Sequence, residues 1–155
     1  RPARGEIMTR KSIQKLEPRV EKRVWGNEIF LVETPNYIGK RLEMNAGTAG
    51  GLQVHVEKEE TFYLLSGRAW VDYDNGVGDL TRHEMVPGEI FHIPTNATHR
   101  VIAVEDCIFF EWSLPIYNDR IRVEPEYEQP IPPGELELET TWEEDELGVL
   151  RRKNV

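Results

Sequence analysis

The chain has one cysteine, no apolar run long enough to cross a membrane, and fewer basic than acidic residues. Cys107 has no partner for an internal disulfide, and the apolar residues around it indicate a buried structural thiol. No segment approaches the roughly 20 apolar residues that a membrane-spanning helix needs. The 19 Lys and Arg face 28 Asp and Glu, whereas a phosphate backbone favours clustered basic residues. We therefore expect a soluble, cytoplasmic protein with no membrane or nucleic acid as partner.

A helical pattern is also missing from the centre of the chain. Short segments of strand-forming residues follow one another there, separated by turn residues. They cover residues 24–32, 37–45, 68–73, 79–85, 89–93, 100–104 and 107–112. Asn75-Gly76 is a strong hairpin signal between two of them. With 155 residues, 39% of them hydrophobic, the chain can build one domain with a core. The pattern predicts an all-β sandwich or barrel.

The two ends of the chain differ from this pattern. Residues 1–22 are basic and have few large apolar side chains, which predicts an irregular N-terminal arm. Residues 125–155 form an acidic, proline-rich tail, expected either to pack on the barrel or a second subunit or to stay solvated. Within the tail, 141–144 is typical of the start of a short helix that ends near Gly148. We expect the barrel at residues 23–124.

Four side chains in the centre of the chain have the chemistry of metal ligands. His55 and Glu57 are two residues apart on a predicted strand, so their side chains point to the same face. Glu60 begins the next strand, and His99 follows a later strand and a proline-bounded turn. Two imidazoles and two carboxylates suit Mn, Fe, Co, Ni or Zn, whereas a closed structural zinc site normally contains thiolates. The alternative is that residues 58–60 form an exposed charged turn.

The spacing of these residues resembles the two motifs of the cupins. The first cupin motif reads His-x-His, a few residues, Glu, six residues and Gly, and here six residues separate Glu60 from Gly67. The second places a His after a Pro-Gly turn, as His99 follows Pro87-Gly88. The resemblance implies a single-domain double-stranded β-helix, or jelly-roll barrel. More narrowly, residues 22–127 resemble the cupin domain of type II mannose-6-phosphate isomerases and their small stand-alone relatives. The matching segments are 25–28, 40, 42, 52–53, 60–67, 93–94, 99–100, 111–115 and 119–124.

The chain departs from the motifs at three positions. Glu57 stands where the family has its second histidine, Asn96 replaces a glycine of the second motif, and Ala103 replaces an asparagine that often closes it. A carboxylate in place of an imidazole keeps a ligand but adds a negative charge. That change favours a harder metal, weakens Lewis acidity, or indicates a site that has lost the family reaction.

The resemblance implies an aldose–ketose isomerase that uses one divalent metal and a small carbohydrate substrate. In this reaction the metal polarises the C1 carbonyl and the adjacent hydroxyl while a base moves a proton between C1 and C2. The candidate catalytic residues are Glu111, Lys40 and Arg122. Glu111 is the expected base because it follows an apolar run, where burial raises the pKa of a carboxylate. An ion pair with Arg120 or Arg122 is the alternative for Glu111, and His83 and His92 are alternative bases.

Lys40 and Arg122 are candidates for binding a phosphate or a hydroxyl group, although Lys40 could simply extend its ammonium to the rim of the barrel. Two other functions fit the same motifs. The altered ligand set is consistent with a non-catalytic cupin that binds a sugar or a sugar nucleotide. Iron held by histidines and a carboxylate supports dioxygenase or decarboxylase chemistry. The outward positions Val54, Val56 and Tyr63, together with the two arms, predict a homodimer.

Overall fold

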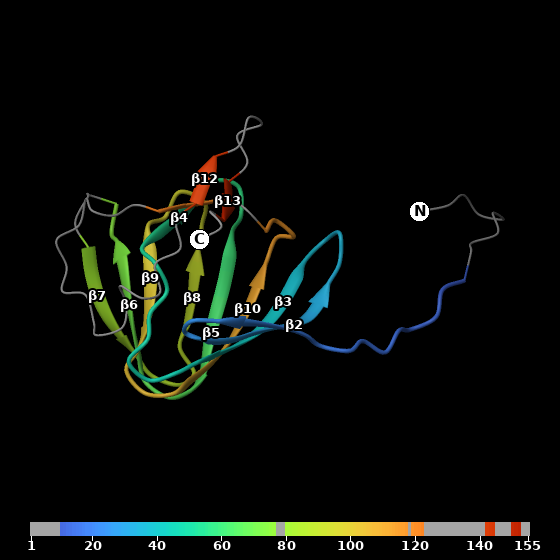
Figure 1. Ribbon diagram of the computed structural model, residues 1–155, viewed down its shortest axis with the longest axis horizontal. Coiled ribbons are helices and arrows are strands. Elements are labelled where there is room, and N and C mark those ends of the chain that lie inside the picture. Colours follow the sequence, from blue (N-terminus) through green and yellow to red (C-terminus); the bar gives the residue numbers. More distant parts are fainter. Residues whose placement is uncertain (1–9, 77–79, 118, 123–141, 145–149, 153–155) are drawn as a thin grey trace.

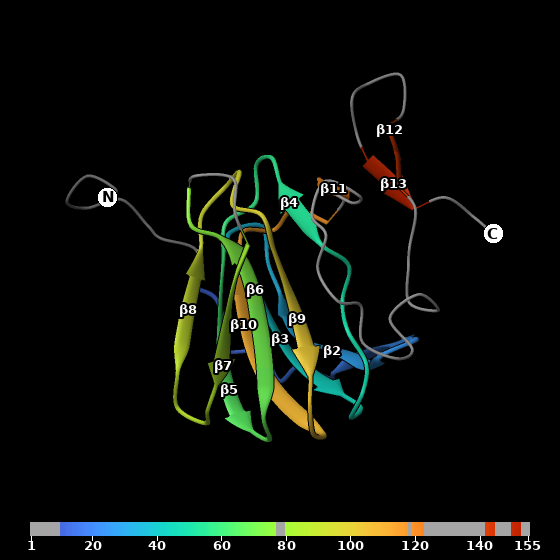
Figure 2. The same ribbon diagram turned by 90° about the vertical axis from the view of Figure 1, so that its left-hand side faces the viewer.

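The computed structural model describes residues 10–76, 80–117, 119–122, 142–144 and 150–152, which form strands and loops without a helix. Two antiparallel sheets face each other (Figure 1 and Figure 2). The strands are β1 Arg19–Arg23, β2 Gly26–Glu33, β3 Ile38–Met44, β4 Gln53–His55, β5 Glu60–Ser66, β6 Ala69–Asp74, β7 Leu80–Met85, β8 Ile90–Ile93, β9 His99–Ala103, β10 Cys107–Ser113, β11 Arg120–Arg122, β12 Trp142–Glu144 and β13 Leu150–Arg152. Among the described residues there is no helix that could span a membrane.

Each of the two sheets combines strands that are far apart in the sequence. The six-stranded sheet has the order β1-β2-β3-β10-β5-β8, and the five-stranded sheet has the order β11-β4-β9-β6-β7. From β3 to β11 the described strands therefore alternate between these two sheets at nearly every step, and within that range only β6 and β7 follow each other in one sheet. This is the arrangement of a jelly roll. The all-β jelly-roll fold predicted from the sequence is confirmed.

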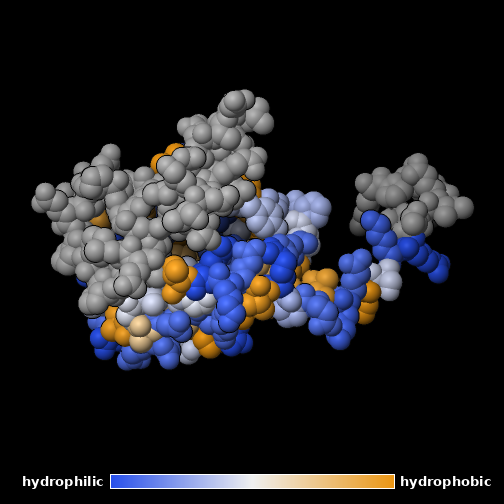
Figure 3. All heavy atoms as spheres, viewed as in Figure 1, coloured by the Kyte–Doolittle hydropathy of each residue, from blue (hydrophilic) through white to orange (hydrophobic). Residues whose placement is uncertain are grey.

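The hydrophobic core fills the space between the sheets. Strand side chains alternate between two faces, and the apolar face of each strand points inward. Ten buried residues form the main cluster: Met44, Phe62, Leu64, Ala69, Val71, Met85, Ile93, Ala103, Cys107 and Phe109. The thiol of Cys107 is buried, as expected, and burial raises its pKa to about 11. On the face shown in Figure 3, hydrophobic residues of the described region are scattered among hydrophilic ones.

Two segments differ from the sequence-based expectations. Residues 10–18 form no strand and are exposed, as predicted for an arm, but β1 lies in the region assigned to that arm and pairs with β2 along its whole length. At the other end, residues 142–144, expected to begin a helix, form β12 and pair with β13. The helix was wrong there because pairing with β13 satisfies the backbone groups that a helix would otherwise pair internally. The rest of the expected helix and residues 123–141 lie outside the described residues.

The homodimer stays a prediction. Of the three apolar side chains that suggested it, Val56 is 45% exposed, and Val54 and Tyr63 are half-buried.

Gly67 closes the turn between β5 and β6, where the backbone has a φ of +90°. A Cβ at this position would lie 2.2 Å from the carbonyl oxygen of Asp106 and 2.9 Å from the sulfur of Cys107. We expect Gly67→Ala to lower the free energy of unfolding by about 2–3 kcal/mol, because backbone strain and a clash with main-chain atoms combine. Thermal and urea unfolding measure this change.

Gly88 supplies the matched control for this substitution. Its φ of +96° is nearly the same, but a Cβ there would meet nothing within 4 Å. Gly88→Ala should therefore cost only the backbone strain, about 1 kcal/mol. Equal destabilisation by the two variants would show that the close approach of Asp106 to Gly67 contributes nothing.

Candidate metal centre and pocket

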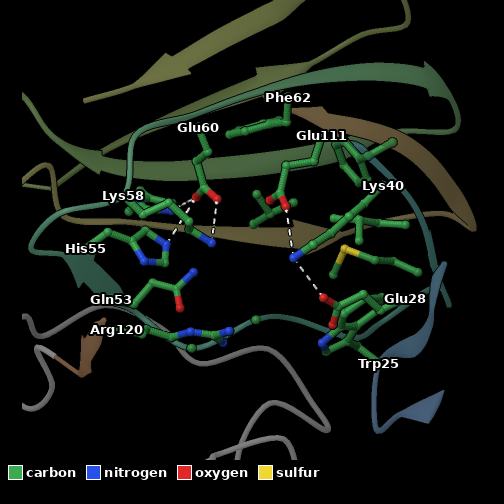
Figure 4. A pocket seen from close by; sticks show the side chains of 17 residues that line it. Trp25, Glu28, Lys40, Gln53, His55, Lys58, Glu60, Phe62, Glu111 and Arg120 are labelled. Atoms are coloured by element: carbon green, nitrogen blue, oxygen red, sulfur yellow. Dashed lines mark hydrogen bonds and ion pairs between the residues drawn. The ribbon is translucent and has the colours of Figure 1, made fainter. Parts of the chain in front are cut away.

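A pocket lined by charged side chains lies between the two sheets. The six-stranded sheet contributes the side chains of Glu28, Lys40, Glu60 and Glu111. The five-stranded sheet contributes those of Gln53, His55, His99 and Arg120. Figure 4 shows His55, Lys58 and Glu60 at one side of the pocket and Lys40 and Glu28 at the other, with Glu111 between them.

Three residues at one side of the pocket form a compact cluster with the chemistry of a metal site. The Nε2 atoms of His55 and His99 lie 3.2 and 3.1 Å from the same carboxylate oxygen, Oε1 of Glu60. All three side chains are at most 4% exposed. They come from the end of β4, the start of β9 and the start of β5, so an ion bound there would join the two sheets. The structure thus brings together three of the four predicted ligands.

Each imidazole of the cluster has a hydrogen-bond partner at Nδ1, and that partner influences whether Nε2 carries a proton or a lone pair. Nδ1 of His55 lies 3.1 Å from Oδ1 of Asp119, and Nδ1 of His99 lies 2.9 Å from the carbonyl oxygen of Ala97. Both partners are acceptors, so each neutral ring can keep its proton on Nδ1 and present the lone pair of Nε2 to an ion bound beside Glu60. Burial lowers the pKa of His55, which favours this neutral form.

Nε2 of His55, Nε2 of His99 and Oε1 of Glu60 therefore converge on one point. Nε2 of His99 forms a hydrogen bond with Oε1 of Glu60 at 3.1 Å, whereas Nε2 of His55, 3.2 Å from the same oxygen, is buried and makes no hydrogen bond. Two imidazole nitrogens and one carboxylate oxygen, with Asp119 and the carbonyl oxygen of Ala97 orienting the imidazoles, are the donor set of a divalent transition metal. The residues present fit such an ion.

Glu57, the fourth predicted ligand, is not part of this cluster. Strand β4 ends at His55 and the chain bends at 56–57, so the two-residue alternation that would place Glu57 beside His55 does not continue. Its side chain is exposed, and Lys58 turns inward instead. The ammonium of Lys58 is buried and lies 3.3 Å from Oε2 of Glu60. The alternative of an exposed charged turn over 58–60 therefore holds only for Glu59.

Lys40 links two carboxylates at the other side of the pocket. Its ammonium lies 2.9 Å from Oε1 of Glu28 and 3.4 Å from Oε2 of Glu111, which is directly opposite Lys40 across the β3–β10 pair. Burial alone would raise the pKa of Glu28, but Lys40 and Arg23 outweigh it and lower the pKa to about 2. Burial also opposes the charge on Lys40, but Glu111 and Glu28 raise its pKa. Glu28 and Lys40 are therefore both charged at neutral pH.

Glu111 differs from the other carboxylates of the pocket. Burial raises its pKa, and the neighbouring charge of Glu60 raises it further, whereas Lys40 opposes both effects. The pKa of Glu60 is well below its usual value, because the imidazoles of His55 and His99 and the ammonium of Lys58 together outweigh the effect of burial. Two adjacent carboxyl groups with divergent pKa values are the arrangement that proton-transfer sites use. The ion pair that the structure gives Glu111 is with Lys40.

The remaining predicted catalytic residues lie elsewhere or outside the described side chains. His83 lies 2.9 Å from Oε2 of Glu89, and His92 is half exposed with its Nδ1 3.0 Å from the hydroxyl of Thr61. Neither histidine lines the pocket. The backbone of Arg122 pairs with Gln53 in β11, but its side chain is outside what the structure describes.

Sequence reasoning missed several residues that line or support the pocket. Glu28 shares the inward face of β2 with Phe30, so the alternation of that strand was a usable signal. Lys58 and Asp119 had no such signal, because a bend positions the first and a contact between distant segments positions the second.

Comparison with known proteins gives a family match for the central part of the chain. Residues 40–112 match the protein-family model described as Cupin domain. The structure resembles the capsular polysaccharide assembling protein CapF from Staphylococcus aureus, with a TM-score of 0.60 and 21% identity over 71% of this chain and 35% of CapF. It also resembles KdgF from Halomonas sp., with a TM-score of 0.51 and 19% identity over 67% of this chain and 87% of KdgF.

Oxalate decarboxylase from Bacillus subtilis is a third structural relative, with a TM-score of 0.61 and 14% identity over 74% of this chain and 33% of the enzyme. At these identities the likeness shows the fold alone. The chain spans about a third of the length of CapF and of oxalate decarboxylase. A search of curated proteins found no match.

Proposed function

Starting from the cupin domain that this chain carries, we propose that it is a metal-dependent enzyme that acts on a sugar or sugar phosphate. The proposed reaction is aldose–ketose isomerisation of the mannose-6-phosphate isomerase type. The observation that carries this proposal is the position of Glu111 in the same pocket as the cluster of His55, Glu60 and His99. A metal centre and a buried carboxyl group are the two parts that the reaction needs.

The metal would be held by His55, Glu60 and His99, with positions left open toward the pocket. A divalent ion bound there supplies Lewis acidity toward a carbonyl and a neighbouring hydroxyl oxygen. Mn, Fe, Co, Ni and Zn all accept two imidazoles and a carboxylate.

Glu111 is proposed to move the proton between the two carbons of the substrate. Its raised pKa makes it a stronger proton acceptor than an ordinary carboxylate. Lys40 holds the carboxylate of Glu111 in place at 3.4 Å and is itself anchored by Glu28. The substrate therefore has to fit between the metal cluster and this pair of carboxylates.

The charges of the pocket favour an anionic sugar. Three carboxylates, of Glu28, Glu60 and Glu111, and three cations, of Lys40, Lys58 and Arg120, line it, so their formal charges cancel. A divalent ion would leave a net charge of +2, which is complementary to a phosphorylated sugar. Lys58 is the cation next to the metal cluster and Lys40 is the cation next to Glu111.

Interconversion of mannose 6-phosphate and fructose 6-phosphate tests the proposal. We expect turnover in a coupled assay or by NMR once one of Mn, Co, Ni, Zn or Fe is added to metal-free protein. Mannose and fructose without phosphate are the matched substrates and should react more slowly. No turnover of either sugar pair with any of the metals contradicts the isomerase, and saturable sugar binding in that case would indicate the non-catalytic alternative.

A dioxygenase is the second candidate function. The described ligands are two histidines and one carboxylate, the set that non-haem Fe(II) oxygenases use with open positions for oxygen and substrate. Oxygen consumption by the Fe(II)-loaded protein in the presence of a candidate substrate would favour it. Isomerase activity that is as high with Zn as with Fe would exclude it as the main reaction, because Zn has no redox chemistry.

A further inference from the structure

Asp119 is held in contact with four successive residues of the first motif. It is 9% exposed and lies just before β11, 64 residues after His55 in the sequence. Its Oδ1 is 3.1 Å from Nδ1 of His55, and its Oδ2 accepts the backbone N–H groups of Glu57 at 2.8 Å and of Lys58 at 2.6 Å. Its carbonyl oxygen accepts the N–H of Val56 at 3.4 Å.

We infer that Asp119 is a positioning residue of the metal centre, one that sets the tautomer of His55 and holds the bend over 56–58. This inference rests on the metal-dependent function proposed above. Asp119 contacts neither the cluster oxygen of Glu60 nor the interior of the pocket, so it acts through His55 and through the backbone.

The first part of the inference follows from the chemistry of the carboxylate. A carboxylate only accepts hydrogen bonds, and His55 forms its hydrogen bond through Nδ1, to Asp119, while its Nε2 makes none. The proton is therefore on Nδ1, and Nε2 is left with the lone pair that a metal needs. With the opposite tautomer, the N–H of Nε2 would point at Oε1 of Glu60, 3.2 Å away, and would occupy the place of the ion.

The second part follows from the bend. The two hydrogen bonds to Oδ2 come from consecutive N–H groups, and they hold the backbone in the conformation that turns Glu57 outward and Lys58 inward. The register of β11 on β4 places Arg120 opposite His55, so Asp119 stands next to the bend as soon as the two strands pair.

Asp119→Asn separates these two roles. The amide oxygen of the asparagine is expected at the position of Oδ2, because two backbone N–H groups require an acceptor there. The amide nitrogen then faces Nδ1 of His55 and donates to it. This reverses the tautomer while it preserves the bend. Asp106→Asn is the matched control, since Asp106 also accepts a backbone N–H, from Ala46 at 2.8 Å, but lies outside the pocket.

The experiment is ¹⁵N NMR of the imidazole nitrogens of His55 in the metal-free full chain, together with metal affinity from competition with a chelator. We expect the proton on Nδ1 in the wild type and in Asp106→Asn, and on Nε2 in Asp119→Asn. We expect the affinity for the metal to fall about 10- to 100-fold in Asp119→Asn only.

Two outcomes would overturn the inference. One is a proton on Nε2 in the wild type, which can be measured even if Asp119→Asn fails to fold. The other is a folded Asp119→Asn with wild-type tautomer or wild-type metal affinity. Failure of the proposed function looks different: a wild type that binds no metal or turns over no sugar, with the proton of His55 still on Nδ1.

Discussion

Replacing Glu60 by Gln is expected to lower the affinity for a divalent metal by more than about a hundredfold. This is a larger loss than the roughly 10- to 100-fold that follows when a hydrogen-bond partner of a ligand is removed. Oε1 of Glu60 lies 3.2 and 3.1 Å from the two imidazole nitrogens, so it is the atom that completes the cluster. An amide removes the negative charge, and its nitrogen can donate to the imidazoles and so fill the position of the ion. Metal content of the purified protein and competition with a chelator measure the loss, and turnover should disappear with it.

Glu59→Gln is the control for this substitution, because Glu59 is adjacent in sequence but exposed and outside the pocket. It should leave metal affinity and turnover unchanged. Thermal unfolding of metal-free Glu60→Gln shows whether the variant is folded, since Lys58 loses its carboxylate partner at the same time. A folded Glu60→Gln variant that binds metal as tightly as the wild type would refute the proposed ligand set.

Glu111→Gln is expected to lower kcat by about 10²- to 10⁴-fold, the range for loss of a general acid or base, while metal affinity changes little. Glutamine has nearly the same shape but cannot take up or release the proton. The local structure should persist, because Lys40 keeps its ion pair with Glu28 at 2.9 Å. Steady-state kinetics and chelator competition on the same preparations separate the two effects.

Glu43→Gln is a matched control on strand β3, where Glu43 pairs with Arg41 away from the pocket. Its kcat should equal that of the wild type. A fall of less than about tenfold in Glu111→Gln would place the base elsewhere, because a positioned base contributes about a hundredfold or more. A parallel loss of metal affinity would instead mean that Glu111 acts through its neighbour Glu60.

Much of the fold could be predicted because strand formation leaves a local signal. In β3, residues Ile38, Lys40, Leu42 and Met44 alternate along the sequence and therefore share one face of the strand. Lys40 lines the pocket and pairs with Glu28, so its ammonium does not extend to the rim of the barrel. The β-strand at 142–144 was missed because its local sequence also suits the first turn of a helix, and only pairing with β13 distinguishes the two.

The candidate site was predictable to the extent that its residues lie within regular strands. His55, Glu60 and His99 were recognised from spacing, and the structure brings their side chains together. Glu57 was placed beside His55 by extending the strand two residues further than it runs. The bend that ends the strand depends on hydrogen bonds from Asp119, which is 62 residues away from Glu57, and no local pattern carries that information.

The sequence by itself therefore determined the all-β class, the strands of the barrel, and the three side chains that converge on one point. These depend on the period of side-chain alternation and on chemistry that each residue carries with it. Only the tertiary structure decided that Lys58 and not Glu57 faces the site, and that Lys40 stands between Glu28 and Glu111. Those features depend on which distant strands become neighbours. The total free energy of packing and strand pairing selects these neighbours, and no local stretch of sequence specifies them.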